Sequence, residues 1–118
     1  MPDRLYQELS YNSPDETLAE IASGEPDRVT RALLGAALES ADPSWVEACA
    51  ISLSLADDNA LRRASLLTLG HLARRFRRPA GPALAAVLRR LEADEDLAPV
   101  VAELRDDLAV YGLSLIHI

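Results

Sequence analysis

The chain contains no lysine, and all twelve of its basic residues are arginine. It has a single cysteine, Cys49, which excludes an internal disulfide and a cysteine-cluster metal site. Aromatic residues make up only 4% of the 118 residues, so a core must be built from leucine, alanine and valine. There is no apolar run long enough to cross a bilayer, and the start MPDRLYQELS has no apolar signal core. We therefore expect a soluble, cytoplasmic protein that does not associate with membranes.

The formal net charge of −7 argues against a domain that binds nucleic acid over its whole surface, since such domains are usually basic. The charge is unevenly distributed. Residues 1–57 carry −8, residues 58–92 carry +6 and residues 93–118 carry −5. The basic middle segment would suit an anionic partner, because arginine pairs with carboxylate and phosphate in a planar, two-pronged geometry. The acidic ends would suit a basic protein, or serve only as solubilising charges.

Helix start and stop signals recur along the chain, and no strand signal is present. In NSPDETLAEIASG, for example, Ser13 is the expected cap, Pro14 the first helical residue and Gly24 the stop. The apolar residues Leu18, Ile21 and Ala22 are expected on the buried side of this helix. Alanine- and leucine-rich composition supports an all-α fold. Six helices are predicted, in NSPDETLAEIASG, EPDRVTRALLGAALES, ADPSWVEACAISLSL, Asn59 to Phe76, the segment around Leu84 to Leu91, and DLAPVVAELRDDLAVYG.

The predicted helix Asn59 to Phe76 has apolar residues over about half of its circumference, at about 100° per residue. Only a helix placed between neighbours needs so wide an apolar side, so this helix is expected to be sandwiched. Its leucines predicted to be buried are Leu61, Leu66, Leu69 and Leu72. Arg63, Arg74 and Arg77 fall, together with Gly70, on one narrow stripe of the opposite side, the arginine stripe, which is expected to face solvent.

The sequence also contains an internal repeat. PDRVTRALL aligns with DNALRRASLL at an offset of 32 residues, so that Val29 matches Leu61 and Ala32 matches Ala64. A fainter copy, ADEDLAPVVAEL, matches ADDNALRRASLL at an offset of 37 residues, with Pro99 and Val100 in place of two arginines. Repeat periods in this range indicate helix pairs that stack into a solenoid, because one pair alone cannot bury its apolar face.

The segment DNALRRASLLTLG, Asp58 to Gly70, resembles the second helix of HEAT-like repeats, with an acidic turn, an arginine and a small residue. The resemblance covers about residues 25–111. More loosely, LTLGHLARRFRR is similar to short bacterial HEAT-like proteins, some of which are immunity proteins against toxins. The resemblance implies a right-handed helix-pair solenoid of three pairs that binds another protein, such as a toxin, without catalysis.

Two sets of residues are candidates for contact with a partner. Arg63, Arg74, Arg77 and Arg78 could bind an anionic protein or, as the alternative function, an anion or nucleic acid; otherwise they form a solvated face. The absence of interleaved aromatic side chains argues against single-stranded nucleic acid. Trp45, in the first turn of its helix, is either an exposed interface anchor or a side chain that fills the gap between two repeats.

No catalytic, metal-binding or cofactor-binding set is predicted, and the chain is not expected to be an enzyme. His71 has no second histidine or cysteine three or four residues away, so a structural role is expected. Cys49 lies among apolar neighbours and is expected to be a buried thiol. Ser52 and Ser54 have no histidine or aspartate at a spacing useful for nucleophilic catalysis.

The final segment LSLIHI, Leu113 to Ile118, breaks the helical pattern after Gly112. It resembles the translation of adapter DNA used in transposase-based sequencing libraries; the alternative is a short apolar strand or docking tail. We therefore expect a single domain over residues 1–112, followed by a non-native tail.

Deletion of Leu113 to Ile118 is expected to leave helicity and melting temperature unchanged, because a non-native tail contributes no packing. Circular dichroism of the full-length and truncated chains checks this expectation. A large fall in melting temperature on truncation would show that the tail belongs to the folded domain.

Overall fold

The computed structural model describes residues 13–77 and 81–112 of the chain, and this part is all-helical, as the sequence predicts. None of the helices in these ranges is both long enough and apolar enough to cross a bilayer. The elements are α2 (Pro14–Ala22), α3 (Pro26–Glu39), α4 (Pro43–Leu53), α5 (Asn59–Phe76), α6 (Pro82–Leu91) and α7 (Ala98–Asp107), which continues as a π-helix (Leu108–Gly112).

The predicted helix starts are confirmed at the level of individual hydrogen bonds. The Ser13 hydroxyl accepts a hydrogen bond from the Glu16 amide at 3.2 Å, and the Glu16 carboxylate accepts one from the Ser13 amide, which completes a capping box. The Asp42 carboxylate accepts from the Ser44 amide at 2.9 Å at the start of α4. Proline stands in the first turn of α2, α3, α4 and α6, where its missing amide hydrogen costs no helical hydrogen bond.

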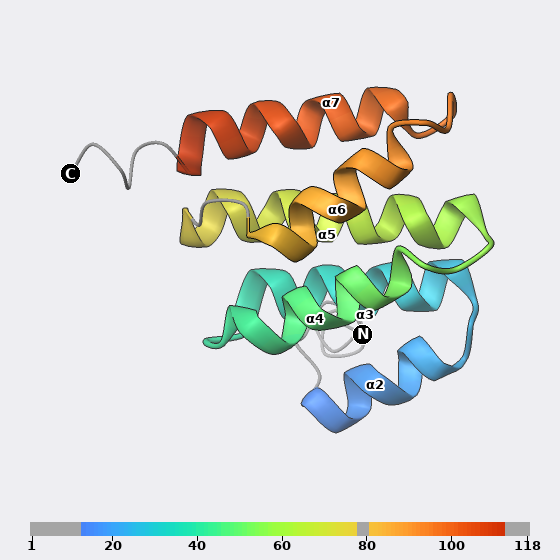
Figure 1. Cartoon of the computed structure of the whole chain (residues 1–118). Helices are drawn as coiled ribbons and strands as arrows, with labels where there is room; N and C mark the ends of the chain where they lie inside the picture. Colours follow the sequence, from blue (N-terminus) through green and yellow to red (C-terminus); the bar gives the residue numbers. More distant parts are fainter. Residues whose placement is uncertain (1–12, 78–80, 113–118) are drawn as a thin grey trace, which may run out of the picture.

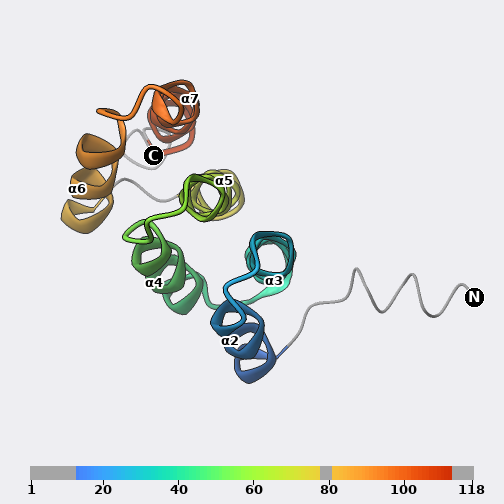
Figure 2. The same ribbon diagram turned by 90° about the vertical axis from the view of Figure 1, so that its right-hand side faces the viewer.

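The helices form two rows. Figure 2 looks along the helix axes and shows α2, α4 and α6 in one row and α3, α5 and α7 in the other. In Figure 1 the helices within a row run in the same direction, and the two rows run in opposite directions. Each row is built by elements that are not consecutive in sequence: α3 packs extensively on α5, and α5 packs on α7. The chain thus crosses from one row to the other at every turn.

Helix α5 lies in the middle of this arrangement and contacts α3, α4 and α7. Its apolar side is covered as predicted: Leu66, Leu69 and Leu72 are 1%, 2% and 3% exposed and belong to the main core cluster, which draws side chains from α3 through α7. Leu61 is only half-buried, and it packs instead against a second, smaller cluster formed by Val29, Leu33 and Leu53.

The buried side of α2 differs from the prediction. Leu18, expected to be buried, is 49% exposed, and Ala22 is exposed as well. The completely buried residue is Thr17, and Ile21 is half-buried. The physical reason is that α2 packs mainly on a single helix, α3, so that only one narrow side of α2 is covered. The apolar stripe read from the sequence is wider than the contact available to it.

Two adjacent leucines of α5 provide a test of the sandwiched arrangement. Leu66→Ala is expected to lower the free energy of unfolding by about 2–5 kcal/mol, because Leu66 is only 1% exposed and its truncation leaves a cavity in the core. Leu67→Ala, at a position that is 40% exposed, should cost about 1 kcal/mol or less. Urea denaturation followed by circular dichroism measures both. Similar losses in the two variants would contradict the assignment of inner and outer sides.

Candidate binding surfaces

In the middle of the predicted arginine stripe of α5, an arginine already has a partner within the molecule. Arg74 Nη1 lies 2.5 Å from Asp107 Oδ2 of α7 and forms an ion pair with it. This pair covers Gly70, whose own surface is buried: a Cβ placed there would lie 3.5 Å from Asp107 Oδ2 and 3.6 Å from Arg74 Nη1. Gly70 was expected to face solvent within the stripe. It faces the Arg74–Asp107 pair instead.

The other residues of the stripe have different surroundings. The Arg63 guanidinium donates to the carbonyl oxygen of Asp96 at 3.3 Å, in the turn before α7. Arg77 ends α5 in the left-handed backbone conformation, with φ at 52°, and its side chain is exposed. Arg78 lies outside the described residues. The structure therefore brings Arg63 and Arg74 to the same helix–helix boundary, between α5 and α7, where each is bound to an oxygen.

Two arginines outside the stripe each bind the carboxyl-terminal end of the preceding helix in their own row. Arg75 Nη1 donates to the carbonyl oxygens of Ala37, at 3.1 Å, and Ser40 at the end of α3. Arg90 Nη2 donates to the carbonyl oxygen and the hydroxyl oxygen of Ser54, at 3.2 and 2.7 Å, at the end of α4. Carbonyl groups in the last turn of a helix have no partner within the helix, and a cation there also interacts favourably with the helix dipole. The arginines supply the missing donors from the next helix of the same row.

These two contacts were not predicted from the sequence. Neither Arg75 nor Arg90 was among the candidate contact residues. A signal is present in hindsight: Arg75 and Ser40 are 35 residues apart, and Arg90 and Ser54 are 36 residues apart, close to the repeat offsets. The residue pairs become visible only when helices one repeat apart are known to be neighbours.

Trp45 is half-buried and packs against the main core cluster. Its indole Nε1 donates to the hydroxyl oxygen of Ser40 at 3.1 Å, and Ser40 is itself 5% exposed. The Ser40 hydroxyl also donates to the Asp42 carbonyl oxygen at 3.1 Å. The side chain thus links the turn between α3 and α4 to the main core cluster.

An open, apolar groove lies between α2 and α4, with a volume of about 620 Å³. We call it the α2/α4 groove. Two of its lining leucines, Leu18 at 49% and Leu55 at 65%, are strongly exposed. The groove shares Ile21, Cys49 and Leu53 with the smaller core cluster, so its floor is continuous with the protein interior. The lining residues are Leu18, Ile21, Ala48, Cys49, Ser52, Leu53, Leu55 and Ala56.

The sequence did not predict this groove. Leu18 was assigned to the interior, and Leu55, two residues beyond the end of α4, was not singled out. Cys49 was expected to be a buried thiol and is half-buried in the groove lining. Burial raises the pKa of the Cys49 thiol above its ordinary value, because the apolar surroundings disfavour the thiolate.

His71 lies beside the Arg74–Asp107 pair, with its Nδ1 at 3.3 Å from Arg74 Nη2. Burial, and then the positive charge of Arg74, lower the pKa of His71, while Asp107 acts in the opposite direction. The imidazole is therefore held in its neutral form next to the ion pair. Over residues 13–77 and 81–112, no three His, Cys, Asp or Glu side chains come together in a way that could hold a metal ion.

Comparison with known proteins finds no family model that matches the chain, and no curated protein or solved structure that is significantly similar to it.

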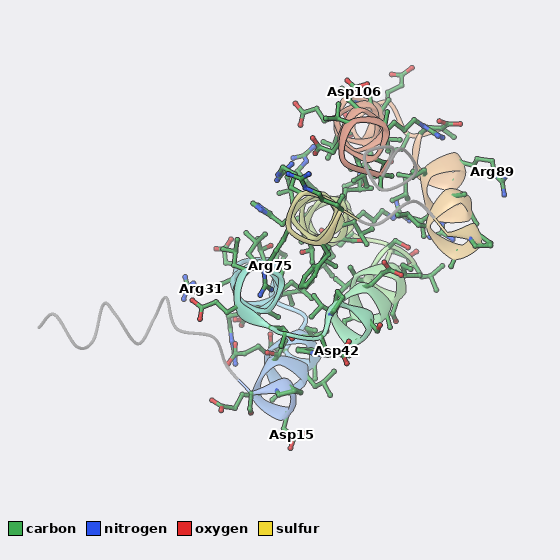
Figure 3. The ribbon with its side chains drawn as sticks, turned by 90° about the vertical axis from the view of Figure 1, so that its left-hand side faces the viewer. Asp15, Arg31, Asp42, Arg75, Arg89 and Asp106 are labelled. Atoms are coloured by element: carbon green, nitrogen blue, oxygen red, sulfur yellow. The ribbon has the colours of Figure 1, made fainter. Side chains whose placement is uncertain are left out.

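Arg75→Gln is expected to lower the free energy of unfolding by about 1 kcal/mol, because the end of α3 loses donors that water replaces only in part. Arg89→Gln removes an equal charge from a side chain of α6 that points away from the helices in Figure 3, and should change stability by less than about 0.5 kcal/mol. Urea denaturation of both variants measures the difference. Equal stability of the two would show that Arg75 does not join α3 to α5.

Proposed function

We propose that the chain is a non-catalytic protein-binding module built as a HEAT-like solenoid of three helix pairs. The two rows of parallel helices support this architecture. So do the contacts of Arg75 and Arg90, since each joins a helix to the equivalent helix about one repeat earlier. Stacked helix pairs offer extended surfaces to other proteins, and a toxin is the sharper form of the partner we propose.

The observation that carries the binding function is the α2/α4 groove. Isolated leucines on a protein surface are ordinary, but Leu18 and Leu55 belong to one continuous apolar surface whose floor reaches the core. Contiguous apolar surface of this kind marks sites where another protein is bound. We therefore place the primary contact at this groove.

The alternative function is binding of an anion or nucleic acid through the arginine stripe. Against it, Arg74 already holds a carboxylate and Arg63 a carbonyl oxygen, so an anionic ligand would have to displace partners that are present in the molecule. Trp45 is likewise a weaker candidate anchor, because its indole donates to Ser40 and packs on the core. In favour of the alternative, Arg77 presents an exposed guanidinium at the end of the stripe.

The test is affinity capture from an extract of the source organism, with two matched double variants. Leu18→Ser with Leu55→Ser removes the exposed leucines of the groove, whereas Leu38→Ser with Leu67→Ser removes equally exposed leucines elsewhere, at 56% and 40%. We expect a partner, identified by mass spectrometry, on the wild type and the Leu38/Leu67 variant but not on the Leu18/Leu55 variant. Calorimetry with the purified partner should show affinity reduced at least about tenfold, since each buried leucine contributes about 1.5–3 kcal/mol.

If the Leu18/Leu55 variant still captures the partner, the binding surface lies outside the groove. If capture is instead lost in an Arg63→Gln, Arg74→Gln variant, and heparin binds the wild type with a steep dependence on salt, the alternative function is correct.

A further inference from the structure

Acidic residues stand at both ends of the α2/α4 groove. At one end, Asp15 lies in the first turn of α2 and Asp42 directly precedes α4; Figure 3 shows both aspartates on the side of the molecule that faces the viewer. At the other end, the groove lining finishes at Ala56, and the chain continues directly into Asp57 and Asp58. The Asp57 side chain is fully exposed.

The two helices that form the groove contribute no arginine to it, because neither α2 nor α4 contains a basic residue. Arginines of the neighbouring helices already have partners: Arg28 of α3 binds the Glu20 carboxylate at 2.7 Å, and the Arg62 guanidinium lies 4.0 Å from the carboxylates of Asp57 and Asp94. Arg90 of α6 donates to Ser54 at the end of α4. The groove therefore combines an apolar floor with negatively charged ends.

We propose that the α2/α4 groove binds the apolar side of a basic amphipathic helix from a partner protein. This inference rests on the proposed function and names the chemistry of the partner. The apolar floor accommodates residues spaced three and four apart on such a helix, as in other helix-in-groove complexes. Lysine or arginine residues flanking that apolar side would meet the acidic ends. Helix α4 has eleven residues, or about 16 Å, so a partner helix of about three to four turns spans the groove.

A second copy of the same chain is a poorer occupant. Two copies that placed their α2/α4 surfaces together would bring like charges into contact, and each chain carries a net charge of −7. Like charges held close together across an interface oppose association. A cationic helix gains from the same charges.

The test uses three synthetic peptides of about 14 residues and the single cysteine of the chain as a reporter. The first peptide is a leucine/lysine amphipathic helix, the second has glutamate at every lysine position, and the third has the composition of the first in a scrambled order without an apolar side. Because Cys49 lines the groove, a bound peptide should slow its alkylation by iodoacetamide. Fluorescence anisotropy of labelled peptides gives the affinities.

The basic amphipathic peptide is expected to slow alkylation at least about fivefold at saturation and to bind at least about tenfold more tightly than the other two. Its affinity should fall severalfold as ionic strength rises from about 0.05 M to about 0.5 M, because salt screens exposed charges. Leu18→Ser with Leu55→Ser should abolish its protection of Cys49.

Charge variants test the role of the acidic ends directly. Asp15→Asn with Asp57→Asn should lower the affinity for the basic peptide about three- to tenfold. The matched control, Glu103→Gln with Asp106→Asn, changes net charge equally on exposed residues of α7, which lies far from the groove in Figure 3, and should leave affinity unchanged. Equal loss in both double variants would show that only the overall charge matters and would overturn the assignment of the acidic ends.

Other outcomes also overturn the inference. Equal binding of the basic and acidic amphipathic peptides removes its charge component, and failure of every peptide to protect Cys49 removes the docking site. Self-association in sedimentation velocity that disappears in the Leu18/Leu55 variant would assign the groove to a second copy. The proposed function is judged separately: a captured partner that depends on Leu18 and Leu55 sustains it even if the peptides show no preference for positive charge.

Discussion

The structure depends on covering the apolar side of α5 from more than one direction. Half of the surface of this helix is apolar, and no single neighbouring helix could remove it from water. Helices α3, α4 and α7 share the task, and they bury Leu66, Leu69 and Leu72 almost completely. Because α3 and α7 stand on opposite sides of α5 within one row, the same requirement that hides the leucines also sets the order of the helices. Polar groups assist: the Ser65 hydroxyl donates to the Ala50 carbonyl oxygen at 2.5 Å and ties α5 to α4.

The features predicted correctly from the sequence are those that short stretches determine. The Ser13 cap, Pro14 as the first helical residue and the buried leucines Leu66, Leu69 and Leu72 of α5 each follow from residues within one or two helical turns. The errors concern residues whose surroundings come from distant parts of the chain. Leu18 has the periodicity of a core residue, but the helix that would cover it is not beside it. Gly70 has the position of a contact site on the helical wheel, but Asp107, which lies 37 residues away in sequence, occupies the space above it.

Charge counted from the sequence is misleading for the same reason, because the partners of the arginines come from distant parts of the chain. A sequence count gives residues 58–92 a charge of +6, which indicates a surface for an anionic ligand. In the folded chain, Arg75 and Arg90 complete the hydrogen bonding of two helix ends, Arg74 pairs with a carboxylate and Arg63 binds a carbonyl oxygen. An arginine that is occupied in this way still contributes charge, but its donors are no longer available without breaking a contact. Much of the basic segment thus serves to hold neighbouring helices together.

The uneven distribution of arginine also determines where acidic side chains predominate. Most basic residues in the part of the chain that the structure describes lie in α5 and α6, whereas α2 and α4 contain acidic residues and no basic ones, so acidic side chains predominate on the two helices that form the α2/α4 groove. Exposed charges act at a distance and mainly raise the rate at which a cationic partner arrives, whereas apolar contact mainly determines how long it stays. The aspartates at the ends of the groove and the leucines that line it would therefore act on different steps of one binding event. A partner that satisfied only one of the two, an apolar helix without positive charge or a basic segment without an apolar side, would lose either fast association or a long residence time.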